Sequence, residues 1–339
     1  MLDAPKRMPP HQQLEVAWAE ANGLDPAGMV ACSSGTAALH LALEAIRSHD
    51  SSVKRVGVPN YSMVAPARAV AMAGMEVVPL PCSYDDRLLS TSIGWVDLDV
   101  LLSVSTYGRV PDMSDCKDSA GSPWVVEDLA EAHFQPVHAE TDAACWSFYR
   151  NKVIAGEEGG AVWFRDPDLA KRARVLRSLG FEDGWTYNHV PRGHNYRLAD
   201  SLASLVLREL QYADMIREAF AKTWGDYRDV LVGHEAIYVP AMPDHPWVFD
   251  LSVKGASRSQ VLGLCSELRD VFGVAARPGF VPLNRQPEFE RDETPGDESA
   301  RVSEETMYLP LKPDPMCVGG VDRRVVSLIK RFADRFVRP

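Results

Sequence analysis

Residues 29–46 read MVACSSGTAALHLALEAI, and this stretch decides the fold class. Met29 to Cys32 is a short apolar run, and a Ser-Ser-Gly-Thr interruption follows it. From Ala37 to Ile46, leucine, isoleucine and alanine recur with the spacing of a buried helix. The stretch therefore predicts a strand, a turn and a helix in succession.

Short apolar runs alternate with helical segments on both sides of this unit. Further strands are expected at 55–58, 76–80, 100–105 and 124–126, and helices at 12–22, 65–73 and 169–179. This alternation is typical of a mostly parallel α/β sheet that helices cover on both faces. In such sheets the chemistry gathers at the carboxyl ends of the strands.

The second part of the chain has a different pattern, which predicts a separate and smaller α+β unit. Its expected elements are a long helical segment over 198–227, strands at 236–239 and 247–253, a helix at 259–272, a mobile loop at 284–305 and an amphipathic helix at 323–338. We place a large domain at 12–212 and a small C-terminal domain at 213–339.

Bulk composition limits the classes of protein and partner. The 339 residues are 46% hydrophobic and 24% charged, as in an ordinary globular protein. A formal net charge of −11 argues against polymeric nucleic acid as a partner, although a local basic pocket could still hold one nucleotide.

The cysteines and the apolar runs indicate where the protein works. Six cysteines lie far apart, which predicts free thiols in a reducing compartment rather than a zinc site or a disulfide framework. The first residues, MLDAPKRMPPHQQLEV, lack the apolar core of a signal peptide, and no run reaches the roughly 20 apolar residues that cross a bilayer. We expect a cytoplasmic protein with no membrane partner.

Ser34-Gly35-Thr36 is the first candidate binding element. A turn between a strand and a helix leaves backbone N–H groups free at the helix start, where they can bind a phosphate. Ser and Thr are also ordinary helix N-caps, so this turn alone leaves both interpretations open.

Two further elements follow in chain order. Glu127 and Asp128 end an apolar run, and Lys152 follows Trp146-Ser147 with a glycine turn behind it. A strand-end carboxylate can pair with a pyridine nitrogen, and a desolvated lysine can form an imine with an aldehyde cofactor. Taken singly, the carboxylates could be a surface pair or a helix cap, and the lysine could be solvated. Asp128 and Lys152 are one strand and one connection apart, so both could reach one crevice.

These elements belong to an ordered series of blocks that resembles the DegT/DnrJ/StrS-type aminotransferases, over about residues 12–311. The blocks are Ser34 to Leu39, Tyr107-Gly108 with Asp112-Met113, Glu127 to Ala132, Ser147-Phe148-Tyr149 with Asn151-Lys152, the glycine turn to Gly160, Gly193 to Leu198, and Leu309-Pro310-Leu311. The resemblance implies a pyridoxal 5′-phosphate (PLP) enzyme of fold type I, like aspartate aminotransferase. It implies a mostly parallel seven-stranded sheet and a smaller α+β domain.

The resemblance also implies roles for single residues. Lys152 would hold PLP as a Schiff base and act as acid and base, and Asp128 would pair with the pyridinium nitrogen. The phosphate would bind to Ser34, Gly35, Thr36 and Ser147. Asn195 would reach the phosphate of the neighbouring subunit's cofactor, which makes a homodimer with shared active sites the expected unit. Asn195 could instead simply cap the helix that follows.

The sequence departs from the family pattern at several places. Met63 takes the position where the family usually packs an aromatic ring on the cofactor, with Tyr61 two residues earlier. Glu131 replaces the usual glutamine and would bring a carboxylate near the phenolic oxygen. Gly156-Glu157 stands where Thr-Gly is common, and the N-terminal arm is short.

Three functions compete. The first is transfer of an amino group from an amino acid, glutamate being the expected donor, to a carbonyl of a sugar- or nucleotide-linked small-molecule acceptor. The second is a PLP-dependent decarboxylase or lyase acting on an amino-acid-bearing substrate, such as an aminoacylated nucleotide; the departures at Met63 and Glu131 motivate it. The third is a non-catalytic PLP-fold protein, which the presence of Lys152 disfavours.

The histidines give no metal signal. His133 and His138 are five residues apart, as are His189 and His194, and neither pair has the i, i+4 spacing of a helical metal site. We expect no metal and ordinary polar histidines, of which His194, beside Asn195, could line the site.

Overall fold

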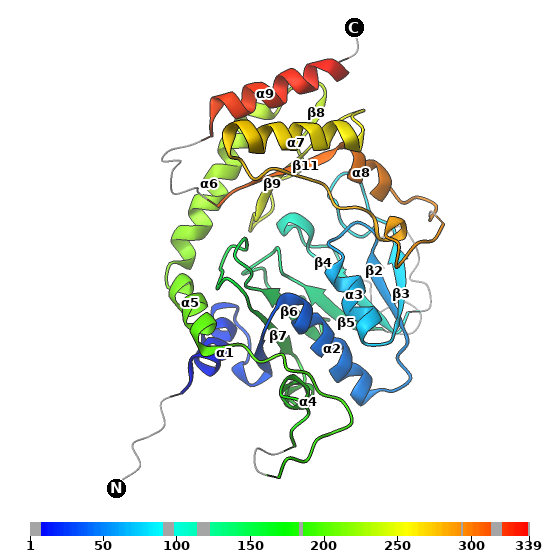
Figure 1. The fold of residues 1–339 in the computed structure, drawn as a ribbon, viewed down its shortest axis with the longest axis vertical. Helices are drawn as coiled ribbons and strands as arrows, with labels where there is room; N and C mark the ends of the chain where they lie inside the picture. Colours follow the sequence, from blue (N-terminus) through cyan, green and yellow to red (C-terminus); the bar gives the residue numbers. More distant parts are fainter. Residues whose placement is uncertain are drawn as a thin grey trace.

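The computed structural model describes residues 8–90, 98–113, 123–182, 186–292, 294–312 and 321–337. Its ribbon contains two sheets, a large one that holds the N-terminal strands and a small one near the C-terminal helices (Figure 1). The prediction of an α/β protein with a mostly parallel seven-stranded sheet and a smaller α+β part is confirmed. The division at residue 212 stays a prediction.

The large sheet has the strand order β1-β7-β6-β5-β4-β2-β3. Its strands are β1 (Met29–Cys32), β2 (Arg55–Pro59), β3 (Glu76–Leu80), β4 (Val100–Val104), β5 (Trp124–Asp128), β6 (Ala143–Ser147) and β7 (Gly160–Phe164). Only β7 pairs antiparallel, with β6 on one side and β1 on the other. Because β7 is reversed, β1 runs parallel to β6, and the ends of β1, β4, β5 and β6 meet at one edge.

Helices cover both faces of this sheet, as the alternation predicted. On one face, Val30 and Cys32 of β1 pack in the same core as the inner residues of α2, α3 and α4. On the other face, Met29 and Ala31 pack with Trp18 of α1 and with α5. These helices are α1 (Pro10–Ala21), α2 (Gly35–His49), α3 (Ala65–Met72), α4 (Pro167–Arg177) and α5 (Asp200–Leu210).

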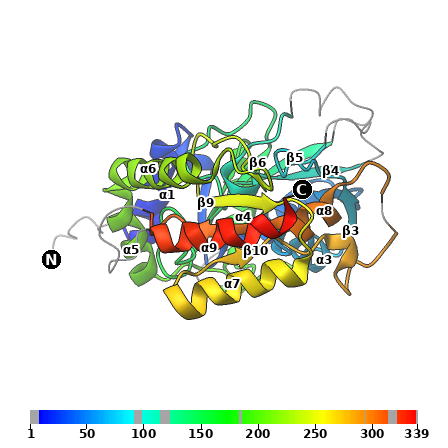
Figure 2. The same ribbon diagram turned by 90° about the horizontal axis from the view of Figure 1, so that it is seen from above.

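The small sheet is antiparallel, with the order β10-β11-β9-β8. Its strands are β8 (Ile237–Tyr238), β9 (Val248–Val253), β10 (Arg277–Pro278) and β11 (Thr306–Pro310), and its helices are α6 (Ala213–Leu231), α7 (Arg258–Phe272), α8 (Ser299–Glu305) and α9 (Arg323–Ala333). Seen from above, α7, α9 and β9 lie in front of the large sheet (Figure 2). The described residues also form short 3-10 turns, namely η1 (Pro26–Gly28), η2 (Thr106–Gly108), η3 (Leu283–Arg285) and η4 (Asp334–Phe336).

Three expectations are wrong in detail. The helical segment 198–227 is two helices, because α5 packs against the large sheet and α6 against the small one, so the chain turns at Gln211 and Tyr212. Within the expected loop 284–305, α8 forms over the last seven residues, and Asn284 is buried against Asn60. The C-terminal helix α9 ends at Ala333, with its apolar residues turned inward.

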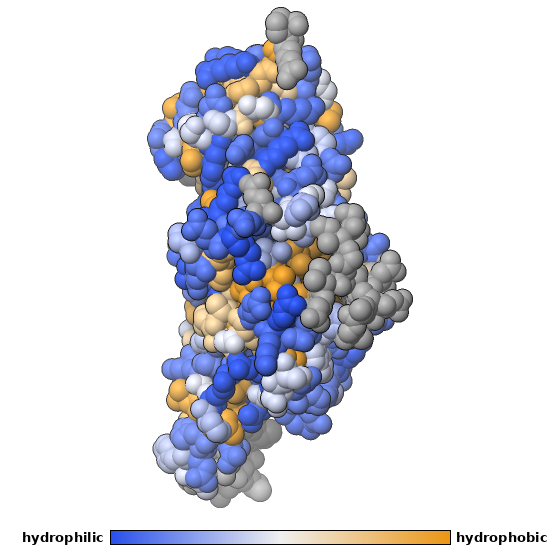
Figure 3. Space-filling model, turned by 90° about the vertical axis from the view of Figure 1, so that its right-hand side faces the viewer, coloured by the Kyte–Doolittle hydropathy of each residue, from blue (hydrophilic) through white to orange (hydrophobic). Residues whose placement is uncertain are grey.

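The face shown in Figure 3 is mostly hydrophilic, with hydrophobic side chains gathered near its middle. Within the described ranges, no helix is both long enough and apolar enough to span a lipid bilayer. Cys32, Cys82, Cys145 and Cys265 are buried free thiols. Cys116 and Cys317 lie outside the described residues.

We predict that Gly160→Ala destabilises the fold by about 1–3 kcal/mol, because the close approach of β7 to the turn after β1 leaves no room for a side chain. An added Cβ at Gly160 would lie against the carbonyl oxygen of Ser34 and 2.8 Å from the nitrogen of Gly35. The matched control is Gly263→Ala, since Gly263 lies in α7 with nothing within 4 Å of an added Cβ.

The free energy of unfolding of the control should rise by about 0.5–1 kcal/mol, because alanine has a higher helix propensity than glycine. Urea unfolding of both variants measures the two changes. Equal stability of Gly160→Ala and the natural protein would contradict the contact.

Candidate functional site

The candidate site lies at the edge where the parallel strands of the large sheet end. Ser34 follows β1, Asp128 ends β5, and Ser147 ends β6, with Lys152 five residues further on. The structure therefore brings the turn at Ser34 to the same edge as Asp128 and Lys152, the two residues that the sequence placed within reach of one crevice. This is the strand edge at which α/β sheets bind their ligands.

The turn after β1 and the end of β6 are in contact. An added Cβ on Gly35 would lie 2.7 Å from the Cβ of Ser147, so only glycine allows this approach. The first N–H groups of α2, those of Gly35 and Thr36, have no acceptor within the helix. Ser34 caps α2, its Oγ accepting from the nitrogen of Ala37 at 3.1 Å, which is the alternative that the sequence had left open.

Lys152 is held away from water, with its side chain 12% exposed. Its Nζ lies 3.7 Å from Oε1 of Glu131 and 4.1 Å from the ring centre of Trp247. Trp247 directly precedes β9, and its indole nitrogen donates to the carbonyl of Asn151 at 2.7 Å. The small sheet therefore contributes one wall around the lysine. A solvated surface lysine, the alternative interpretation from the sequence, is not what the structure contains.

Glu131 is buried beside this lysine. Its Oε2 accepts a hydrogen bond from the backbone nitrogen of Tyr107 at 2.9 Å. Burial raises the pKa of Glu131 to about 7, while Lys152 lowers it. The carboxyl group can therefore change its charge near neutral pH.

Asp128 is a buried carboxylate with few partners. Ala130 donates its backbone N–H to Oδ1 at 3.0 Å. Burial raises the pKa of Asp128, and the hydrogen bond from Ala130 and the charge of Lys152 lower it. A further positive or hydrogen-bonding group at this carboxylate would be stabilising.

His133 is not the ordinary polar histidine that we expected. It is buried, its Nδ1 accepts from the nitrogen of Ile154 at 3.3 Å, and its Nε2 lies 3.0 Å from the carbonyl of Ser147. These partners require a neutral ring with the proton on Nε2. Burial, together with Lys152, lowers the pKa of His133 to about 3. The ring braces both ends of the loop that carries Lys152, and its spacing in the sequence gave no sign of this.

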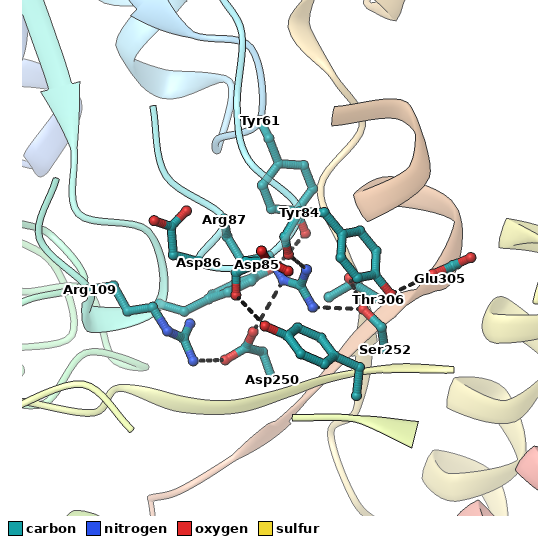
Figure 4. Close-up of polar contacts among 12 residues, drawn as sticks. Tyr61, Tyr84, Asp85, Asp86, Arg87, Arg109, Asp250, Ser252, Glu305 and Thr306 are labelled. Atoms are coloured by element: carbon teal, nitrogen blue, oxygen red, sulfur yellow. Dashed lines mark hydrogen bonds and ion pairs between the residues drawn. The ribbon is translucent and has the colours of Figure 1, made fainter. Parts of the chain in front are cut away.

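A buried charge network joins the segments after β3 and β4 to β9 of the small sheet (Figure 4). Oδ1 of Asp250 in β9 accepts from Arg109 at 2.8 Å, and Oδ2 lies 3.5 Å from Nε of Arg87. Arg87 also donates to Ser252 at 2.7 Å. Arg109 is two residues after Tyr107, so the network fixes η2 against β9. No local sequence pattern marks these residues, because their partners lie more than 140 positions away.

Met63 and Asn195 lie on the surface of the single chain. Met63 is 51% exposed, whereas Tyr61 is buried, with its hydroxyl 2.8 Å from that of Tyr107. Asn195 and Arg177 are among the residues that line an open cavity of about 360 Å³. His194 stacks on Tyr196 and lies 4.7 Å from the ring of His40, in a cluster apart from Lys152. In the described part of the chain, no three His, Cys, Asp or Glu side chains are grouped to hold a metal ion.

Comparisons with known proteins agree on one family. The sequence profile of the DegT/DnrJ/EryC1/StrS aminotransferase family matches residues 8–328. GDP-perosamine synthase of Caulobacter vibrioides is 29% identical over 298 residues, which are 82% of this chain and 78% of that protein. The dTDP-3-amino-3,4,6-trideoxy-alpha-D-glucose transaminase of Streptomyces venezuelae is 27% identical over 325 residues, which are 90% and 83% of the two chains. The crystal structure of S. venezuelae DesV has a TM-score of 0.81 and 25% identity, covering 98% of this chain and 92% of that one.

Relatives and structural neighbours of the chain are PLP-dependent aminotransferases, and the strand edge fits this cofactor. A phosphate suits the helix start beside Ser147, where glycine leaves space. A pyridinium suits the carboxylate of Asp128, and an aldehyde suits the shielded amine of Lys152.

We predict that the neutral state of His133 makes stability depend on pH. A histidine whose folded pKa is about 3 stabilises the fold fully above its unfolded pKa near 6.5, and this contribution is lost as the pH falls. The natural protein without cofactor should therefore lose about 2 kcal/mol relative to His133→Gln between pH 8 and pH 5. Urea unfolding of both proteins at the two pH values measures the difference. A constant difference would show that His133 is not buried in its neutral form.

Proposed function

Because the chain belongs to the DegT/DnrJ/EryC1/StrS aminotransferase family, we propose that it moves an amino group from glutamate to a carbonyl of a nucleotide-linked sugar. The chain is a PLP-dependent aminotransferase. Two relatives named above act, by their names, on GDP- and dTDP-linked sugars. The identity of the donor and the nucleotide-linked acceptor are our proposals for this chain.

One observation carries the proposal: a lysine largely shielded from water lies at the sheet edge where β5 ends in Asp128. Glu131 and Trp247 contact Lys152. The charge of Lys152 also interacts with the carboxylate of Asp128. A lysine kept from water is suited to covalent chemistry rather than to solubility.

Each residue of the edge has a proposed part. When bound, PLP supplies an aldehyde that captures amines and a ring that accepts electrons from the reacting carbon. Lys152 would hold the aldehyde carbon and later carry the proton between two substrate atoms, with its Nζ as the donor and acceptor. Asp128 would keep the ring nitrogen protonated, which preserves the electron-accepting character of the ring.

The remaining proposed residues hold the cofactor in place. The N–H groups of Gly35 and Thr36 and the hydroxyl of Ser147 would bind the phosphate, and Ser34 would fix the helix start that presents them. Met63 would pack its thioether on the ring face.

We also propose a homodimer in which each subunit completes the other's site. Asn195 lies on the surface, beside an open cavity that it shares with Arg177. Its segment is anchored to the turn after β1, because the nitrogen of Ser33 donates to the carbonyl of Tyr196 at 2.8 Å. A second subunit docked here would receive the amide of Asn195 at its own phosphate site.

The alternative hypothesis, a decarboxylase or lyase, is not favoured, since the relatives are named for amino-group transfer. The non-catalytic hypothesis is set aside with it. The cytoplasmic location expected from the sequence stays a prediction.

We predict that the purified protein with PLP converts glutamate to 2-oxoglutarate and forms pyridoxamine phosphate without an acceptor. Lys152→Ala should lose the visible absorption band of the bound cofactor and slow the conversion by about 100- to 10,000-fold, because the proton carrier is removed. Lys171→Ala, at an exposed lysine that pairs with Asp168, is the control and should leave both unchanged. Release of carbon dioxide without 2-oxoglutarate would favour the lyase hypothesis instead.

We predict that two inactive variants restore activity when mixed. Lys152→Ala and Asn195→Ala, dissociated and reassembled in equal amounts, should give about a quarter of the natural activity, since half of the dimers then carry one complete site. Activity no higher than that of the two separate variants would contradict the sharing of sites. Size-exclusion chromatography with light scattering checks that dimers have formed.

A further inference from the structure

We propose that Glu131 is the counter-ion of the Lys152 side-chain nitrogen in the free enzyme, and that it keeps this role when the nitrogen is bound to the cofactor. The second half of this statement rests on the proposed function, in which Lys152 binds PLP. The first half concerns the protein alone.

The geometry selects Glu131 over every other carboxylate in the described part of the chain. Its Oε1 is the only carboxylate oxygen found within 4.0 Å of Nζ of Lys152 in those ranges. Both side chains are shielded, with 12% of the lysine and 8% of the glutamate exposed. Solvent therefore screens this pair much less than a surface pair.

The carboxylate is fixed in this position by the backbone. Oε2 of Glu131 is held by the N–H of Tyr107, which leaves Oε1 for the lysine. Tyr107 is itself anchored, because its hydroxyl lies 2.8 Å from that of Tyr61 and its ring stacks on Phe280 at 5.5 Å. Its backbone has a φ of 57°, a left-handed conformation that turns the N–H toward the carboxylate.

A second neighbour of the ammonium, the ring of Trp247, also favours a positive charge. The ring of Trp247 lies 4.1 Å from Nζ, and the face of an aromatic ring attracts a cation. An uncharged amine would lose both the ion pair and this attraction. The pocket is therefore built for the protonated nitrogen.

The other groups that face Glu131 leave its charge adjustable. Asp128, on the same segment, raises the pKa of Glu131, and Lys152 lowers it. Tyr308 of β11 interacts with Glu131, but burial raises the pKa of that phenol, so it stays neutral. Glu131 carries its negative charge above a pKa of about 7. As the pH falls below this value the carboxylate is protonated, and Lys152 loses its counter-ion.

Glu131→Gln isolates the charge, since glutamine keeps the shape and an oxygen for the N–H of Tyr107. The control is Glu127→Gln, which removes a second buried glutamate four residues earlier. Glu127 accepts from Thr141 at 2.6 Å and from His138 at 3.0 Å and has no contact with Lys152.

The first experiment titrates the absorption spectrum of the holoenzyme with pH, which reports the protonation of the nitrogen bound to PLP. In Glu131→Gln the midpoint should fall by about one to three pH units, because an opposite charge has been removed. Glu127→Gln should keep the natural midpoint. An unchanged or higher midpoint in Glu131→Gln would overturn the proposal.

The second experiment uses the protein freed of cofactor and does not depend on transamination. The rate at which Lys152 reacts with trinitrobenzenesulfonate, followed by peptide mass spectrometry across pH, reports the pKa of the free amine. Glu131→Gln should shift this profile to lower pH and speed labelling at pH 8 by about tenfold or more. Glu131→Asp keeps the negative charge but places it farther from Nζ, so its profile should lie between those of the natural protein and Glu131→Gln. This variant also serves if the glutamine variant does not fold.

The two experiments separate the failure of each proposal. If neither the natural protein nor the variants bind PLP at Lys152, the proposed function fails while the labelling profile still tests Glu131. If PLP binds and both profiles stay in place, Glu131 is not the counter-ion.

Discussion

An ammonium group that leaves water needs opposite charge or an aromatic face in its place. Lys152 receives both, and they come from different parts of the fold: Glu131 follows β5 of the large sheet, and Trp247 precedes β9 of the small one. The position of the small unit is therefore coupled to the charge at the site. The buried Asp250 network strengthens this coupling, because it binds residues after β3 and β4 to β9. The rest of the site depends on this one enclosed charge.

Much of the large sheet could be predicted from the sequence because its signals are local. The strands β1 and β3 begin and end at the predicted residues, and the turn at Ser34 has the capping chemistry of a helix start. Lys152 and Asp128 were found because each stands next to a short apolar run that ends at the sheet edge. The family resemblance then suggested that they act together, and the profile match over 8–328 confirms the family.

What the sequence did not reveal depends on contacts between distant segments. The break between α5 and α6 carries no glycine or proline, since it arises from packing on two sheets. His133 looked ordinary because its partners, Ser147 and Ile154, are set by the hairpin and not by helical spacing. The same holds for Arg87, a fully buried cation that no local pattern marks. The proposed roles of Asn195 and Met63 are contacts with a second subunit and with the cofactor. The fold of one chain does not determine such contacts.

The reversed strand β7 has a consequence for how the chain closes on itself. Ser147 pairs with Gly160 across a short hairpin, whereas the same Gly160 pairs with Cys32 across a segment about ten times longer. Loop-closure entropy grows with the logarithm of length, so the second pairing costs about 2 kcal/mol more. The hairpin that presents the lysine is thus the least costly closure at this edge. The larger loss of conformational entropy accompanies the pairing of β1, the strand that precedes Gly35, with β7.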